Sequence, residues 1–262
     1  MTFSHIETRS CPAVVRYDLA ADGRHGGPVV IFARKAVPAG GRDDATDLVI
    51  VSGPLGQRGA LATAVQLSER HAGPALRIAV CEPERDDDTR SGMASPVLLA
   101  AFDAVFVVRR SDSAQFVRRL VRALTIPDDT PNWIGCAWGD VRHAVKPACG
   151  ARLARHGHGT AGRAEAACTA AMAHMERQGA RLRDAGSVCV SVTTAGPALP
   201  GKEALAVVIL LRAAMHPAAT IIQSLGCDAT LPPGTLDVSV FAFGADVTGV
   251  PVSTHHQENT RP

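Results

Sequence analysis

The stretch Asp47-Leu-Val-Ile-Val-Ser-Gly-Pro-Leu-Gly-Gln-Arg-Gly-Ala-Leu-Ala-Thr-Ala64 decides which fold we expect for this chain. Its apolar run from Leu48 to Val51 predicts a buried strand, and the run from Ala60 to Arg70 predicts a helix. A loop with three glycines lies between them. A strand, a glycine-bearing loop and a helix are typical of sites where backbone N–H groups and a helix N-terminus bind a phosphate.

The three glycines of the loop are Gly53, Gly56 and Gly59, and Arg58 precedes the last of them. Glycines allow the backbone to approach an anion closely, because no Cβ atoms stand in the way. The spacing matches neither the Walker motif nor the dinucleotide-binding motif. Two interpretations therefore stay open for this loop, a phosphate site and an ordinary turn between a strand and a helix.

Length and composition describe a globular protein of one large domain or two modest domains, with 262 residues of which 46% are hydrophobic and 20% charged. A net charge of +2 and only 4% aromatic residues argue against a nucleic-acid partner. The N-terminal residues lack the features of a signal peptide, and no apolar run reaches the roughly 20 residues of a spanning helix. We therefore expect a cytoplasmic protein without an integral membrane segment.

The sequence predicts no metal site. The seven cysteines are scattered and never in C-x-x-C spacing, which favours buried thiols in a reducing compartment over disulfides or zinc ligands. The acidic run Asp86–Asp88 is expected to be solvated. His156 and His158 have no carboxylate or cysteine at ligand spacing, so we interpret them as histidines of a flexible loop. Cys81 follows a predicted strand, and the neighbouring glutamates are expected to raise its pKa.

Strands and helices alternate between residues 48 and 124, which predicts a parallel sheet with helices on its faces. The helix expected at the end of this region carries Arg118, Arg119 and Arg122 away from its apolar stripe, which indicates a solvated basic face. After a proline-rich break at residues 127–131, two helices and three strands follow. The alternating polar and apolar residues of these strands predict an α+β domain with a half-exposed sheet.

Two stretches of the second half carry a family resemblance, Gly139-Asp-Val-Arg-His-Ala-Val and Gly157-His-Gly-Thr-Ala-Gly-Arg-Ala-Glu-Ala-Ala. They resemble the (A)-D-V-R stretch and the G-x-G-x-A-x-G-x-x-R-A block of FtsZ, the bacterial tubulin. The strand Thr235-Leu-Asp-Val-Ser-Val-Phe-Ala-Phe-Gly resembles the closing strand of that family, and Asp47–Gly53 resembles the strand before the tubulin signature loop. The resemblance spans roughly residues 12–244.

The resemblance implies an α/β fold of FtsZ/tubulin type, in which a Rossmann-like GTPase domain is joined to a smaller α+β domain through a core helix. We accordingly expect a truncated, degenerate Rossmann-like domain with a parallel sheet at residues 1–110. A short core helix and linker at 111–130, an α+β domain at 131–246 and a polar tail at 247–262 are expected to follow.

The signature loop of the family, G-x-G-G-G-T-G-T-G, is degenerate in this chain. Gly53, Gly56 and Gly59 remain, while the other glycines and both threonines are replaced by Leu55, Gln57, Arg58, Ala60 and Leu61. The first strand of the family and its glycine-rich loop have no counterpart. The resemblance therefore implies GTP or GDP as the nucleotide if any cofactor binds, with the three glycines and Arg58 as the remnant of its phosphate site, and we expect no bound cofactor.

The loop that completes GTP hydrolysis on the neighbouring subunit reads N-x-D-x-x-D in the family. The corresponding stretch, Gly135-Cys-Ala-Trp-Gly-Asp140, keeps only the last carboxylate. Asp140 is thus the expected remnant of a catalytic loop, and Ala137 stands where the family has an aspartate. A carboxylate missing from this loop is expected to impair hydrolysis even when nucleotide is supplied.

The sequence therefore predicts an FtsZ-like cytoskeletal or cell-division-related protein, defective in GTP binding and hydrolysis, that acts through filament-type contacts. Its expected partners are FtsZ-type subunits of the same cell or other copies of itself. Two alternatives stay open. In the first alternative, the chain is an active, polymerising GTPase in which Arg58 meets a phosphate directly. In the second, it is an unrelated small-molecule module that uses a Rossmann-like crevice.

Overall fold

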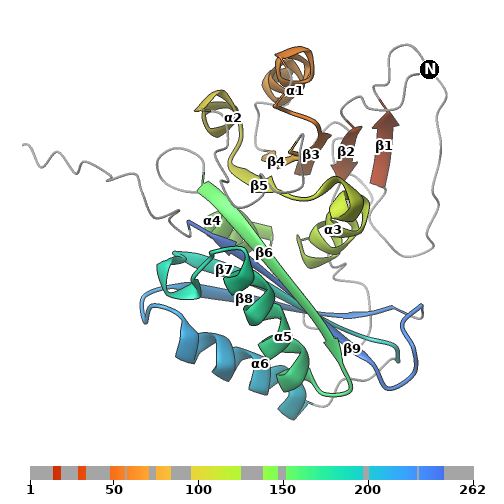
Figure 1. Ribbon diagram of the computed structural model, residues 1–262, viewed down its shortest axis with the longest axis vertical. Helices are drawn as coiled ribbons and strands as arrows, with labels where there is room; N and C mark the ends of the chain where they lie inside the picture. The colour runs from red at the N-terminus through yellow and green to blue at the C-terminus, as the bar shows by residue number, and fades with distance from the viewer. Residues whose placement is uncertain are drawn as a thin grey trace, which may run out of the picture.

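The computed structural model describes residues 14–18, 29–33, 48–56, 58–70, 75–83, 96–124, 138–146, 152–196, 201–228 and 230–244. The strands in these ranges form one sheet with the order β1-β2-β3-β4-β5-β6-β9-β7-β8 (Figure 1). Their bounds are β1 Val14–Asp18, β2 Val29–Ala33, β3 Leu48–Gly53, β4 Leu76–Cys81, β5 Ala104–Val107, β6 Arg152–Ala161, β7 Ser187–Thr194, β8 Thr220–Cys227 and β9 Leu236–Phe243.

The first part of the sheet is built around β3, β4 and β5, which pair in parallel as predicted. β1 and β2 extend this part through antiparallel pairs. The first three residues of β6 pair in parallel with β5, and β6 then pairs in antiparallel fashion with β9 over eight residues. Because β6 belongs to both parts, the sheet is continuous from the parallel strands to the mixed β6-β9-β7-β8 group.

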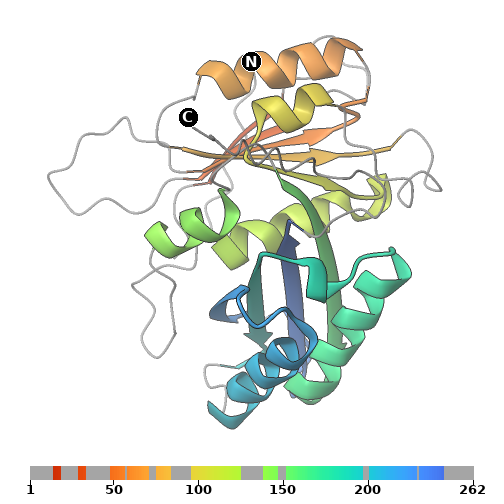
Figure 2. The same cartoon turned by 90° about the vertical axis from the view of Figure 1, so that its left-hand side faces the viewer.

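Six α-helices and one 3-10 turn cover the described sheet in layers: α1 Arg58–Arg70, α2 Pro96–Ala101, α3 Arg110–Leu124, α4 Trp138–Val145, α5 Ala164–Arg177, η2 Leu182–Asp184 and α6 Gly201–Ala214. Figure 2 shows α1 and α2 on one side of the first part, α3 and α4 in the middle, and α5 and α6 on the far side of the second part. Among the residues that the structure describes, no helix has the length and hydrophobicity needed to cross a membrane.

Helix α3 joins the two parts of the sheet through one buried face. Phe116 lies 5.0 Å from Phe106 of β5 and 5.9 Å from Phe241 of β9, measured between ring centroids. Leu120 and the buried side of α4 belong to the same hydrophobic core. The core helix predicted for this region is therefore present, and its buried face contacts both parts of the sheet.

The prediction that the arginines of α3 form a solvated basic face is wrong for two of the three. Arg119 forms an ion pair with Asp237 at 3.1 Å, and Arg122 forms one with Asp228 at 2.7 Å. Both aspartates belong to the second part of the sheet or to the loop that leaves it. These arginines therefore connect the core helix to β9 and to the end of β8.

The prediction that the sheet of the second part is half exposed is also wrong. Every residue of β7 and β9 is buried, although serine, threonine and aspartate alternate with apolar residues in both strands. The reason is that α5 and α6 cover one face of these strands while α3 and α4 cover the other. The polar positions are occupied by small side chains, or by Asp237, whose carboxylate is paired.

Strand β6 contains residues 157–161, which the sequence suggests are part of a loop. Its glycines are required by the close approach of α5. A Cβ atom at Gly157 would lie 2.1 Å from the carbonyl oxygen of Ala171, and one at Gly159 would lie 2.2 Å from that of Ala167. The G-x-G spacing that resembles FtsZ thus has a packing reason in this chain.

Replacing Gly157 by alanine should lower the free energy of unfolding by about 3 kcal/mol, because the backbone of α5 cannot move away from the new methyl group without losing its packing. The matched control is Gly162→Ala, where the added Cβ would lie 3.8 Å from its nearest neighbour. Urea denaturation, monitored by circular dichroism, measures the free energy of unfolding of both variants. Equal stability of the two variants would contradict the close packing of β6 and α5.

Candidate functional site

The glycine-bearing loop after β3 folds back on its own backbone. Gly53 has a φ of 150°, which favours glycine. Its carbonyl oxygen accepts hydrogen bonds from the N–H groups of Leu55 and Glu82, both at 2.8 Å. The loop is therefore a tight turn fastened to the end of β4.

Leu55 anchors this turn in the hydrophobic core. Its side chain is fully buried, in a cluster with Val51 and Leu98 on the side of the sheet that α1 and α2 cover. In the resemblance, Leu55 occupies a glycine position of the signature loop. A side chain at this position thus draws the loop toward the protein interior.

Cys81 lies opposite Gly53 in the register of β3 and β4. Burial raises the pKa of the Cys81 thiol, and the nearby Glu82 raises it further, as the sequence predicts. The backbone N–H groups of Leu55 and Gly56 lower this pKa, but burial is the larger effect. The N–H group of Leu55 is used within the turn, and Pro54 has none.

The structure brings the predicted phosphate-site residues into one segment. Gly53 ends β3, Gly56 is exposed in the turn, and Arg58 and Gly59 lie in the first turn of α1. Gln57 lies outside the described residues. Gly56 and Gly59 are therefore the described glycines of this segment that face solvent.

Asp140 lies apart from this loop, in the first turn of α4, and its side chain is exposed. The opposite face of α4 is held firmly: Val141 and Val145 are buried, and the carbonyl oxygen of Ala144 accepts a hydrogen bond from the Ser187 hydroxyl. Residues 135–137, Ala137 among them, lie outside the described residues. Asp140 is thus presented to solvent from a fixed helix.

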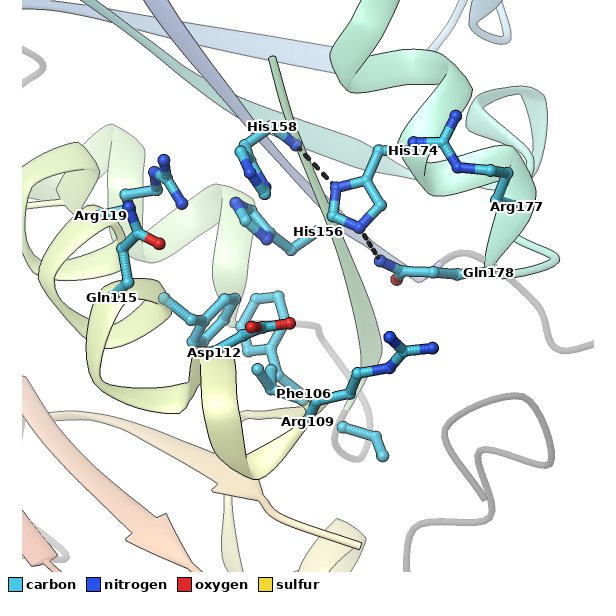
Figure 3. Close-up of a pocket in the computed structure, with 13 residues that line it drawn as sticks. Phe106, Arg109, Asp112, Gln115, Arg119, His156, His158, His174, Arg177 and Gln178 are labelled. Carbon is cyan, nitrogen blue, oxygen red and sulfur yellow. Dashed lines mark hydrogen bonds between the residues drawn. The ribbon is translucent and has the colours of Figure 1, made fainter. Parts of the chain in front are cut away.

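The prediction that His156 and His158 belong to a flexible loop is wrong. His156 and His158 lie in β6, and they border a pocket of about 410 Å³ between the end of β5, α3, β6 and α5. Figure 3 shows their two rings stacked and pointing to the α3 side, with His174 beside them. The ring centroids of His158 and His174 are 4.8 Å apart. No sequence pattern indicates this cluster, because His174 is sixteen residues away from His158 and lies on a different element.

All three histidines of the pocket are neutral at pH 7. Burial, together with the positive charge of Arg119 and the neighbouring His174, lowers the pKa of His158 to about 4. Burial also holds the pKa of His156 well below its usual value, and burial with the nearby Arg177 lowers that of His174. Among the residues that the structure describes, no group of three or more histidine, cysteine, aspartate or glutamate side chains is arranged to hold a metal ion.

Comparison with solved structures identifies the architecture. The chain is similar to an empty FtsZ dimer from M. jannaschii, with 20% identity and a TM-score of 0.56. It is also similar to a mutant FtsZ from M. jannaschii, with 20% identity and a TM-score of 0.59. The chain has an FtsZ/tubulin-like fold.

Both structural matches cover 76% of this chain, which spans 64% of the first FtsZ chain and 66% of the second. Neither a protein-family model nor a curated protein matches the sequence significantly. The expected fold class, with its parallel N-terminal sheet and core helix, is therefore confirmed by structure. The glycine-bearing loop lies between β3 and α1, at the carboxyl edge of the parallel strands.

Leu55→Ala should lower the free energy of unfolding by about 3 kcal/mol, because a fully buried leucine is truncated and leaves a cavity. Leu205→Ala is the matched control, since Leu205 is 57% exposed on α6 and should change stability by less than about 0.5 kcal/mol. Chemical denaturation measures both values. A neutral effect of Leu55→Ala would mean that the loop is not anchored as described.

Proposed function

We propose that this chain is an FtsZ-like cytoskeletal or cell-division-related protein that lacks effective GTP binding and hydrolysis and acts through filament-type contacts. The observation that carries this proposal is the closed loop after β3. In a working phosphate site, the backbone N–H groups of such a loop point outward to an anion. Here the N–H group of Leu55 donates to the carbonyl oxygen of Gly53 in the same chain, and Pro54 has no N–H group.

The remaining features of the loop support the same conclusion. The family positions filled by Leu55 and Ala60 lack the glycine freedom and the hydroxyl group that the signature loop supplies. Opening the loop to receive a phosphate would expose Leu55, which is fully buried. Arg58 and the first turn of α1 could still attract an anion, and this keeps the active-GTPase alternative testable.

A contact function is supported by the preserved opposite end of the molecule. In the family, filaments are head to tail, so that the hydrolysis loop of one subunit meets the nucleotide face of the next subunit. The stretch with Gly139 and Asp140 is exposed at the start of α4, which is firmly held by the core. One of the FtsZ structures similar to this chain is a dimer. The two ends of this chain therefore differ in their competence for assembly.

GTP and GDP should not bind saturably below about 1 mM, which corresponds to about 4 kcal/mol of binding free energy. The physical reason is that the Leu55 N–H group is engaged within the turn and that the Leu55 side chain stands at a glycine position of the family loop. Isothermal titration calorimetry with each nucleotide measures this. Micromolar binding that Gly56→Val abolishes would contradict the proposal, since a Cβ at Gly56 has no neighbour within 4 Å and the variant should still fold.

Substoichiometric addition of the chain to assembling FtsZ from the same cell should reduce the polymer that light scattering detects. The exposed α4 end can dock on a nucleotide-bearing subunit, while the other end offers no nucleotide to the next subunit. Asp140→Lys should weaken this capping by about tenfold in effective concentration, because it reverses the one charge retained from the family loop.

The control for the capping experiment is Glu69→Lys, which makes the same charge change at an exposed position of α1. Circular dichroism checks that both variants keep the fold. Unchanged assembly at an equimolar ratio, together with the absence of a complex in size-exclusion chromatography, would rule out capping. An equal loss of capping in both variants would show that the effect comes from net charge and not from a specific contact of Asp140.

A further inference from the structure

We propose that the pocket between α3, β6 and α5 is a binding site for a small oxyanion, a compound that carries a carboxylate or phosphate group. The pocket has a volume of about 410 Å³, which is within the range of small-molecule sites. None of the residues that line it belongs to the loop after β3 or to α1. The inference therefore does not depend on whether the chain binds GTP.

Two buried ring nitrogens of this pocket lack a hydrogen-bond partner among the described residues, Nε2 of His156 and Nδ1 of His158. The side chain of His156 is only 9% exposed. A buried polar atom without a partner lowers stability, and most such atoms in folded proteins are satisfied. The histidines are therefore set up to form hydrogen bonds with a molecule that enters the pocket.

His174 holds this arrangement in place. Its Nδ1 accepts a hydrogen bond from the backbone N–H of His158 at 3.3 Å, and its Nε2 lies 3.0 Å from the amide of Gln178. Figure 3 shows both bonds, which fix the ring of His174 beside His158.

The charges around the pocket favour an anion. Arg109, Arg119 and Arg177 line it, against the single lining carboxylate of Asp112. Arg119 is paired with Asp237 of β9, so that two guanidinium groups face one carboxylate at the rim. An oxyanion adds a negative charge beside these groups, and guanidinium groups bind carboxylate and phosphate oxygens well.

Binding should be linked to proton uptake. A bound anion stabilises the imidazolium form, so the pKa of His158 in the complex lies above its value of about 4 in the free protein. Affinity therefore rises as pH falls through the pKa of the complex, by up to about tenfold per pH unit for one proton, and levels off below about 4. The groups that bias this titration are Arg119 and Asp112 of α3, His174 of α5 and Asp237 of β9.

The direct test is a titration of the full chain with inorganic phosphate and, separately, with succinate, at pH 7.5 and pH 5.5. Histidine side-chain ¹⁵N chemical shifts report on His156 and His158, and sodium chloride at matched ionic strength is the blank. We expect saturable shifts with a dissociation constant of about 1 mM at pH 5.5, and at least fivefold weaker binding at pH 7.5. Comparison of the two probes distinguishes a phosphate site from a carboxylate site.

Variants of the rim should change affinity in opposite directions. Arg177→Gln should weaken binding about threefold, and Asp112→Asn should strengthen it about threefold, because the two charges act on the anion with opposite sign. Arg183→Gln, at an exposed position outside the pocket, should leave the affinity unchanged. All three positions are exposed, so the fold should be retained in each variant.

His156→Phe separates ligand binding from a structural role. The ring of His156 stacks on Phe241 at 4.7 Å, and a phenyl ring can occupy the same place. This variant should raise the melting temperature at pH 5.5, because it removes a buried nitrogen without a partner, and should abolish oxyanion binding. The proposal is overturned if neither probe shifts the histidine signals beyond the chloride blank, or if the two rim variants change affinity equally. A lower melting temperature of His156→Phe would likewise overturn it, by assigning His156 to structure.

Discussion

The packing of α3 against both parts of the sheet is the interaction on which this structure depends. Phe116 and Leu120 are buried between side chains of β5 and β9, and burial of side chains of this size contributes about 1.5–3 kcal/mol each. The same helix face serves both parts of the sheet, so neither part can keep its core when α3 moves away. The ion pairs of Arg119 and Arg122 add direction to this packing, since each arginine has one carboxylate partner in the second part.

Strand β6 shows how the alternation of a β-strand serves two purposes at once. Successive side chains of a strand point to opposite faces. Gly157 and Gly159 lie on the face where α5 approaches the backbone, and His156 and His158 lie on the other face, where the pocket is. The glycines that allow close packing on one side therefore position the histidines on the other side.

The elements that the sequence predicts best are those whose signal is local. The apolar run Leu48–Val51 and the strand Leu236–Phe243 are found where expected, because buried strands need continuous or alternating apolar residues. The sequence of β6 is typical of a loop because its glycines are explained only by the close approach of α5, which lies later in the chain. The sequence does not predict α4 because its eight residues give too little periodicity.

The candidate site was predictable only in part, for the same reason. Gly53, Gly56, Arg58 and Gly59 are adjacent in sequence and stay together in the structure. The contact of the loop with Cys81 depends on the parallel register of β3 and β4, and the histidine cluster depends on the fold of β6 against α5. Neither arrangement can be predicted from the spacing of the residues concerned.

The burial of Leu55 gives a physical measure of how strongly the closed loop is favoured. Exposing a leucine side chain to water costs about 2–3 kcal/mol, and 1.4 kcal/mol corresponds to a tenfold change in an equilibrium. An open loop would thus be populated at about 1–4%, and the apparent affinity for any phosphate would fall by a factor of about 30 to 100. Restoring single glycines elsewhere in the loop does not remove this penalty. Under the proposed function, Leu55 therefore weakens nucleotide binding through the conformation of the loop.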